Sequence, residues 1–191
     1  AQDAAKSDQQ NPLFLMSYAQ ILHQEQNYQA AQTYYQKIIE MDDEFYQAYY
    51  NLGDIYIKQN KTNEATQLYQ HIYKKQPQFE DTALILGQLY VLKDQSELAL
   101  PILLGVYRQT PFDKNTLYLL GLSYFKLQQF QNASNIFSEY LDLSQDYQVL
   151  RLKWSADLSL GKTPLVKKSI RQFLKKDPSH SQARQILNSI Q

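Results

Sequence analysis

Small and large apolar residues alternate with polar ones along this chain in a helical pattern that repeats every 34 residues. Four Ala residues in this series are each followed, four positions later, by a large residue: Ala31 by Tyr35, Ala65 by Tyr69, Ala99 by Leu103 and Ala133 by Phe137. Four positions are about one turn of α-helix, so each Ala shares a helix face with its large partner. Only five Gly and six Pro interrupt the chain, and good helix formers are abundant. The pattern predicts an all-α protein.

A second series of residues has the same period. The pairs Leu52-Gly53, Leu86-Gly87 and Leu120-Gly121 are 34 residues apart, and a Tyr stands three positions after each Gly, at Tyr56, Tyr90 and Tyr124. A Gly on a helix lets a neighbouring backbone come close, whereas Pro, found here at Pro77 and Pro111, ends a helix. These residues resemble the tetratricopeptide-repeat (TPR) family, whose unit is a pair of antiparallel helices of this period.

The resemblance implies a right-handed superhelical solenoid of five repeats followed by a capping helix. The repeats are expected at about 12–45, 46–79, 80–113, 114–147 and 148–180, and the cap at 180–191. The helix pairs are expected at 13–25 and 28–41, 46–59 and 62–75, 80–93 and 96–109, 114–127 and 130–143, and 148–160 and 163–176. We expect residues 12–191 to form a single domain and residues 1–11 to form a flexible polar segment.

The chain departs from the repeat pattern in two places. Pro178 lies 67 residues beyond Pro111, one short of two periods, so the fifth repeat has lost a residue, which we expect in its inter-helix turn. At the 34-residue spacing, Trp154-Ser155 stands where other repeats have Leu-Gly, and Lys167 falls where they have Ala. Pro101 stands beyond the first turn of its predicted helix, which predicts a kink or a late helix start there.

The TPR resemblance implies that a ligand lies in a concave groove lined by the first helix of each pair. Residues one turn apart on those helices form the predicted partner-binding groove. They are Met16, Gln20, His23, Tyr50, Asp54, Ile57, Leu84, Gln88, Val91, Tyr118, Leu122, Phe125 and Leu152, with Ala156 and Ser159 beyond them. This set is largely apolar and aromatic, which suits an amphipathic helix or an extended hydrophobic segment of a protein or peptide.

Four members of this groove have an alternative role. Ile57, Val91, Leu122 and Phe125 are also the residue types that fill the core between repeats. The groove further lacks the Lys, Asn and Arg clamp with which the TPR domains of chaperone partners grip a terminal carboxylate, so binding of a chaperone tail is disfavoured.

Charge is divided unequally along a chain whose formal net charge is zero. Residues 1–147 carry 17 acids and 10 bases, whereas residues 148–191 carry 2 acids and 9 bases. Five of these bases form a possible basic patch on the helix before Pro178: Lys167, Lys168, Arg171, Lys175 and Lys176. The patch is either a solvated helix face or a site for an acidic partner, with lipid and nucleic acid disfavoured. Opposite charge at the two ends also permits self-association.

No pattern of catalytic, cofactor-binding or metal-binding residues is present. The chain has no Cys, and His23, His71 and His180 fall in different repeats without the spacing of a zinc site. Phosphate-binding loops, dinucleotide fingerprints and nucleophile elbows are also missing. No stretch is long and apolar enough to predict a transmembrane segment.

These observations predict a non-catalytic protein-interaction scaffold. We expect it to act in assembling a bacterial envelope, secretion or pilus machine, because the polar segment from Ala1 is similar to the start of a chain whose signal peptide has been removed, and the surface is rich in Gln and Asn. A periplasmic or envelope location is favoured on the same grounds. The alternative is a cytoplasmic TPR chaperone or adaptor, or a TPR segment of a larger protein.

Overall fold

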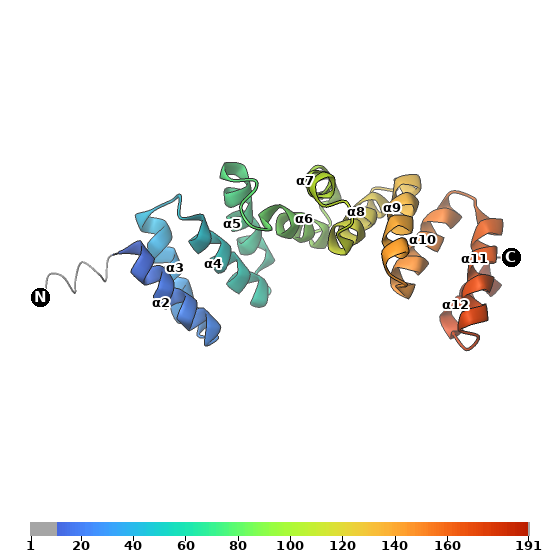
Figure 1. Ribbon diagram of the computed structural model, residues 1–191, viewed down its shortest axis with the longest axis horizontal. Helices are drawn as coiled ribbons and strands as arrows, with labels where there is room; N and C mark the ends of the chain where they lie inside the picture. The colour runs from blue at the N-terminus through green and yellow to red at the C-terminus, as the bar shows by residue number, and fades with distance from the viewer. Residues whose placement is uncertain (1–10, 191) are drawn as a thin grey trace, which may run out of the picture. The chain divides into compact units, whose positions relative to one another are not determined.

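The computed structural model describes residues 11–190, and this part of the chain contains eleven α-helices and no strand (Figure 1). The helices are α2 (Pro12–Gln24), α3 (Tyr28–Met41), α4 (Tyr46–Lys58), α5 (Thr62–Lys75), α6 (Thr82–Leu92), α7 (Ser96–Gln109), α8 (Lys114–Lys126), α9 (Phe130–Leu143), α10 (Tyr147–Ser159), α11 (Thr163–Lys176) and α12 (Ser181–Ser189). The all-α prediction is confirmed, and the helix ends lie within two residues of the predicted ones. The predicted segment 1–11 lies outside the described residues except for Asn11, whose side chain caps α2.

The helices form two compact units, 1–93 and 94–191. In the described part of the first unit, α2 pairs with α3 and α4 with α5, and α6 follows them. In the second, α7 precedes the pairs α8–α9 and α10–α11, and α12 follows. That the five repeats make one continuous domain stays a prediction.

Small residues at the helix crossings explain the Leu-Gly series. A Cβ on Gly53 would lie 2.7 Å from the Tyr69 ring, and one on Gly121 would lie 2.5 Å from the Phe137 ring. Tyr69 and Phe137 are fully buried, so neither ring can move aside without opening the core. Gly is therefore required where the first helix of these two pairs crosses the second.

The turns between paired helices have one backbone design, which the sequence pattern did not predict. In the first pair, Gln26 takes φ 60°, its N–H donates to His23 O, and Asn27 N–H donates to Leu22 O. This is the Schellman arrangement, in which a left-handed residue closes the helix and satisfies its last carbonyls. Asn60 holds the left-handed position in the pair α4–α5, Gln128 in α8–α9 and Gly161 in α10–α11.

The residue missing from the fifth repeat lies before its first helix, and not in its inter-helix turn as predicted. The inter-helix turns 160–162 and 59–61 both contain three residues. The connection before the first helix is shorter in the fifth repeat, because 144–146 has one residue fewer than 42–45. Helix α10 therefore begins at Tyr147, one residue earlier than predicted. In this register Trp154 aligns with Gly53 and Val166 with Ala65, so Lys167 does not occupy the small-residue position.

Helix α7 does not start late, because it begins at Ser96 and runs through Pro101 to Gln109. Pro101 has no N–H to give to the carbonyl of Glu97 one turn earlier. Both residues are exposed, so water can satisfy that carbonyl. The helix therefore tolerates a Pro that a buried face would reject.

Candidate functional site

The predicted groove residues of the first unit divide into accessible and buried positions. Gln20, Gln88 and Ile57 are exposed, and His23, Tyr50, Asp54 and Leu84 are half-buried. Met16 and Val91 are only 6% and 3% exposed. Met16 belongs to the core of α2–α4. Val91 is buried, in agreement with its alternative role as a core residue. These two side chains cannot offer a surface to a partner.

One accessible part of this surface is a polar pocket of about 590 Å³ between α2, α3 and α4. Its lining brings together three predicted groove residues, Gln20, His23 and Asp54, and adds Gln24, Gln26, Tyr28, Tyr35, Asn51 and Lys58. The expectation of an apolar groove therefore does not describe this pocket. Lys58 was missed, although it stands one turn after Asp54 and extending the same helical spacing would have found it.

Three charged or titratable side chains form the centre of the pocket. Asp54 Oδ2 lies 2.5 Å from Lys58 Nζ and 3.1 Å from His23 Nε2. Lys58 Nζ is also 3.2 Å from that imidazole nitrogen. The Asp54 carboxylate thus compensates the Lys58 charge, while Gln20, Gln24 and Asn51 supply amide donors and acceptors nearby. Such a lining can hydrogen-bond a peptide backbone or polar side chains.

Burial lowers the pKa of His23 below its ordinary 6.5, and the nearby Lys58 charge lowers it further, against the opposing effect of Asp54. Folded His23 therefore binds a proton less readily than an ordinary imidazole. Because the unfolded chain binds the proton more readily, acidification from pH 7 to about pH 5.5 should destabilise the first unit. His23→Gln should remove part of this loss, as measured by thermal melting at both pH values. An equal loss in wild type and His23→Gln would contradict the assignment.

Tyr50 was predicted as a groove contact, but it is already engaged within the first unit. Its hydroxyl donates to Asp81 at 2.5 Å, and its backbone carbonyl accepts from the Tyr69 hydroxyl at 3.3 Å. Burial raises the pKa of Tyr50, and the hydrogen bond to Asp81 adds to this rise. Its ring also packs edge-on against Tyr69 and Phe79. Tyr50 therefore orders the start of α6 at least as much as it forms a surface.

The second unit offers a more apolar surface on α8. Tyr118 is exposed, and Leu122 and Phe125 are half-buried. Phe125 packs edge-on against Phe130 at 5.6 Å, so part of its ring serves the core and part remains accessible. The aromatic character predicted for the groove holds for this helix.

The register of α10 changes which of its residues continue that surface. Leu152 packs against the core around Ala133 and Phe137, and Ala156 is fully buried. The positions that correspond to Tyr50 and Asp54 are Arg151 and Ser155, both exposed. The prediction of Leu152, Ala156 and Ser159 is therefore shifted by one residue, which on a helix is about 100° of rotation.

The predicted basic patch lies on α11, where Lys168, Arg171, Lys175 and Lys176 are exposed and Lys167 is half-buried. Helix α11 contains no acidic residue. Within residues 11–190, no ion pair involves any of these five cations. Their positive charge is therefore not neutralised by the described part of the chain.

Comparison with family models and solved structures bears out the repeat pattern. The tetratricopeptide-repeat model matches residues 22–89, and the model of anaphase-promoting complex, cyclosome, subunit 3 matches residues 59–140. The chain is a tetratricopeptide-repeat protein. No curated protein sequence matches it.

Three solved TPR structures show the similarity of fold. YrrB, described as "a TPR protein with an unusual peptide-binding site", is 17% identical with a TM-score of 0.84, covering 97% of this chain and 96% of its own. MamA from AMB-1 is 20% identical with a TM-score of 0.77, covering 89% and 93%. MamA from Desulfovibrio magneticus RS-1 is 16% identical with a TM-score of 0.75, covering 89% and 97%. At these identities the likeness concerns the fold alone.

TPR proteins are in general non-catalytic interaction scaffolds, and the fold of this TPR protein supports that role. Within residues 11–190, no three His, Cys, Asp or Glu side chains lie close enough to hold a metal ion. None of the helices described here has the length and apolar character needed to cross a membrane.

Proposed function

We propose that this TPR protein is a non-catalytic scaffold that holds a segment of a partner protein against the first helices of its repeats. The observation that carries the proposal is the pocket of about 590 Å³, in which Gln20, His23 and Asp54 from two successive first helices converge. The similarity in fold between this chain and YrrB, which is described as having an unusual peptide-binding site, also supports binding of a partner segment.

The two units would recognise different features of a partner. In the first, the amides and the Asp54–Lys58 pair suit polar side chains or exposed peptide groups. In the second, Tyr118, Leu122 and Phe125 suit apolar side chains. A segment with both polar and apolar side chains, such as the amphipathic helix predicted from sequence, fits the chain better than an extended hydrophobic segment.

Site-specific photo-crosslinking tests this proposal in cells that express the protein. A photoreactive phenylalanine analogue placed at Gln20 or at Tyr118 should give an adduct with the same partner protein. The same analogue at the exposed Gln67 of α5 or Asn135 of α9, on second helices, serves as the matched control. The proposal fails if the controls give the same adducts or if Gln20 and Tyr118 give none.

Removing two pocket groups should weaken binding of the partner identified in this way. Because each hydrogen bond to a charged or amide group contributes about 0.5–3 kcal/mol, Gln20→Ala/Asp54→Ala should raise the partner's Kd about tenfold or more. Titration by isothermal calorimetry measures this change. Gln20 is exposed and Asp54 only half-buried, so the melting temperature should change little. An unchanged Kd would exclude the pocket as the binding site.

The Gln and Asn content of the surface bears on where the protein acts. We infer that the partner belongs to a bacterial envelope, secretion or pilus assembly, supported by the Gln-rich and Asn-rich surface. A cytoplasmic chaperone or adaptor role is the alternative. Fractionation of the native host cell, followed by immunoblotting, separates periplasm and membrane from cytoplasm and decides between them.

A further inference from the structure

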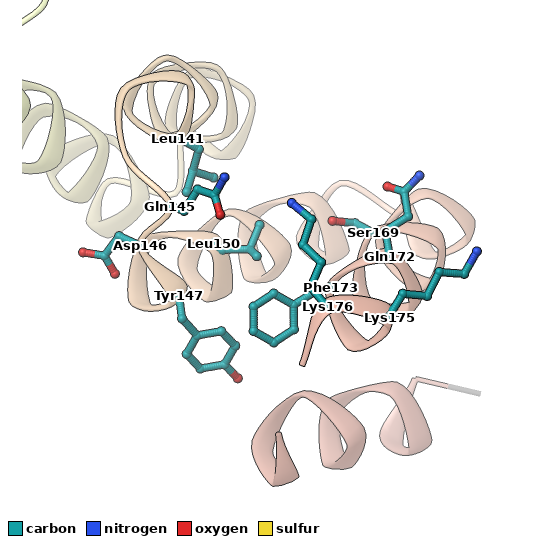
Figure 2. A pocket seen from close by; sticks show the side chains of 10 residues that line it. All are labelled: Leu141, Gln145, Asp146, Tyr147, Leu150, Ser169, Gln172, Phe173, Lys175 and Lys176. Carbon is teal, nitrogen blue, oxygen red and sulfur yellow. The ribbon is translucent and has the colours of Figure 1, made fainter. Parts of the chain in front are cut away.

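A second pocket, of about 620 Å³, lies in the second unit between α9, α10 and α11 (Figure 2). Its apolar walls are Leu141, Tyr147, Leu150 and Phe173, and Lys175 and Lys176 also line it. None of these residues belongs to the predicted groove. The volume falls within the range of about 300–1,000 Å³ found for ligand pockets.

The pocket exists because the fifth repeat uses smaller side chains where an earlier repeat uses aromatic ones. Helices α4–α5 and α10–α11 have the same lengths and the same turn length, so Leu150 corresponds to Tyr49 and Gln172 to His71. In the first unit, the rings of Tyr49 and His71 stack 4.3 Å apart at 9°. Leu150 and Gln172 have no such rings, and the corresponding space is a pocket.

Trp154 enlarges the separation of the two helices that form the pocket. It stands where α4 and α8 have Gly53 and Gly121, at the crossing with the second helix. Its indole packs edge-on against Tyr147 and Phe173 and donates to Ser169 Oγ at 2.9 Å. A buried indole at this crossing prevents the close approach that Gly permits in the pairs α4–α5 and α8–α9.

The walls suit a large apolar side chain. The rings of Tyr147 and Phe173 lie 5.2 Å apart, tilted by 32°, and Figure 2 shows them side by side below Leu150. An aromatic or branched aliphatic side chain that packs against these two rings and against Leu150 would leave water and contact three apolar surfaces. Removal of such a side chain from water favours binding.

The charge around the pocket is positive. In Figure 2 Lys176 extends across the pocket toward Leu150, and the Lys175 side chain points outward beside it. Asp146 also lines the pocket, but its carboxylate accepts the N–H groups of Gln148 and Val149 at the start of α10. Asp146 is thus held as a helix cap and pairs with neither lysine.

We propose that this pocket binds an acidic peptide segment of a partner protein through one large apolar side chain. The side chain enters between Leu150 and Phe173, and Asp or Glu residues beside it pair with Lys175 and Lys176. The positive charge of residues 148–191, with 9 bases and 2 acids, favours such a segment at longer range. A flat anionic surface would use the lysines but not the apolar pocket, so the pocket favours a peptide.

A displayed library of random twelve-residue peptides tests this proposal on the full chain. Peptides are selected for binding to wild type and then depleted on Leu150→Tyr/Gln172→His, which rebuilds the ring pair of Tyr49 and His71 and fills the pocket. The surviving peptides should carry Asp or Glu around one Phe, Trp, Leu or Ile. Survival of no peptide, or of peptides without acidic residues, would overturn the proposal.

Affinity measurements on the surviving peptides separate the two contributions. Fluorescence anisotropy should show at least a tenfold higher Kd for the filled variant and for Lys175→Glu/Lys176→Glu. Lys167→Glu/Lys168→Glu makes the same charge change on the same helix outside the pocket, and should change Kd less than threefold. Equal effects of the two charge reversals would contradict the proposal. Lys175 and Lys176 are exposed, so this comparison stands even if the filled variant fails to fold.

Other anions are tested with the same variants. Phosphatidylserine vesicles, oligo(dT) and oleate are each titrated against wild type, the filled variant and Lys175→Glu/Lys176→Glu. Weak binding that depends only on the lysines agrees with the proposal when the selected peptides bind more tightly. If one of these anions binds more tightly than every selected peptide, the surface is a site for that anion and the peptide proposal is overturned.

Discussion

Trp154→Ala is expected to lower the free energy of unfolding of the second unit by about 3–5 kcal/mol, the cost usual for removing a large buried aromatic side chain. Trp154 is only 2% exposed and belongs to the core that joins α10, α11 and α12. Its removal would leave a cavity between Val166, Ile170 and Phe173, and would also leave the Ser169 hydroxyl without its donor.

Hydrogen exchange of the α10 and α11 amides, together with chemical denaturation followed by circular dichroism, measures this loss. Trp154→Phe keeps a ring but removes the indole N–H, so its cost should be smaller. Leu165→Ala is the matched surface control, because Leu165 lies on α11 and is 62% exposed. A loss below about 1 kcal/mol for Trp154→Ala would show that Trp154 does not hold this core together.

The helix pairs could be predicted because α4–α5 and α8–α9 depend on the same contact. Gly53 and Gly121 must stay small to let the Tyr69 and Phe137 rings lie across them, so both members of the pair recur together. This coupling produces the 34-residue period, from which the helix ends follow to within two residues. The start of α6 is one of the larger differences, since Glu80 takes φ 47° and cannot begin the helix.

The register of the fifth repeat could not be fixed from Pro178 alone. That spacing shows that one residue is missing but not where, and the two placements differ by one position throughout α10. A further signal was present in the residues Val166 and Ile170. They repeat the small-to-large spacing of Ala65 and Tyr69, and both are buried. This pair places the deletion before α11, but it does not distinguish the inter-helix turn from the connection before α10.

The candidate site was predicted in part because residue type does not decide exposure at the edge of a helix face. Gln20 and Asp54 are accessible as expected. At the last groove position of each helix, however, His23 is half-buried, Ile57 exposed and Val91 buried. The neighbouring helix decides this outcome, and its position is not encoded in the residue itself. The second pocket was missed for a related reason, since it arises from side chains that are smaller than their counterparts.

A second large effect is expected at Asp157, whose side chain is mostly buried in the second unit. It stands at the position that Tyr56, Tyr90 and Tyr124 hold in the earlier repeats, once the register of α10 is known. Its two oxygens accept from Ser134 Oγ at 2.7 Å and from Lys153 Nζ at 2.6 Å. Burial acts to raise the pKa of Asp157, but these hydrogen bonds and the charges of Lys153 and Lys162 outweigh it and hold the pKa below 3.8.

Asp157→Ala should therefore lower the free energy of unfolding of the second unit by about 2–4 kcal/mol, because it leaves the largely covered Lys153 charge and the Ser134 hydroxyl without their partner. Asp157→Asn keeps an acceptor for Ser134 but no charge for Lys153, so it should cost less. Lys126→Ala, which breaks an ion pair with the exposed Asp94, is the control and should cost about 1 kcal/mol or less. Denaturant unfolding at pH 7 measures all three.

The pH dependence gives this prediction an independent check. Because the folded pKa of Asp157 lies below the unfolded value, its contribution is complete well above pH 4 and is lost as the pH falls through that range. Wild type should therefore lose stability more steeply than Asp157→Asn between pH 5 and about pH 3, and the two curves should converge at the acid end. Parallel curves over this interval would mean that the Asp157 carboxylate is not the charge that stabilises the contact between α9 and α10.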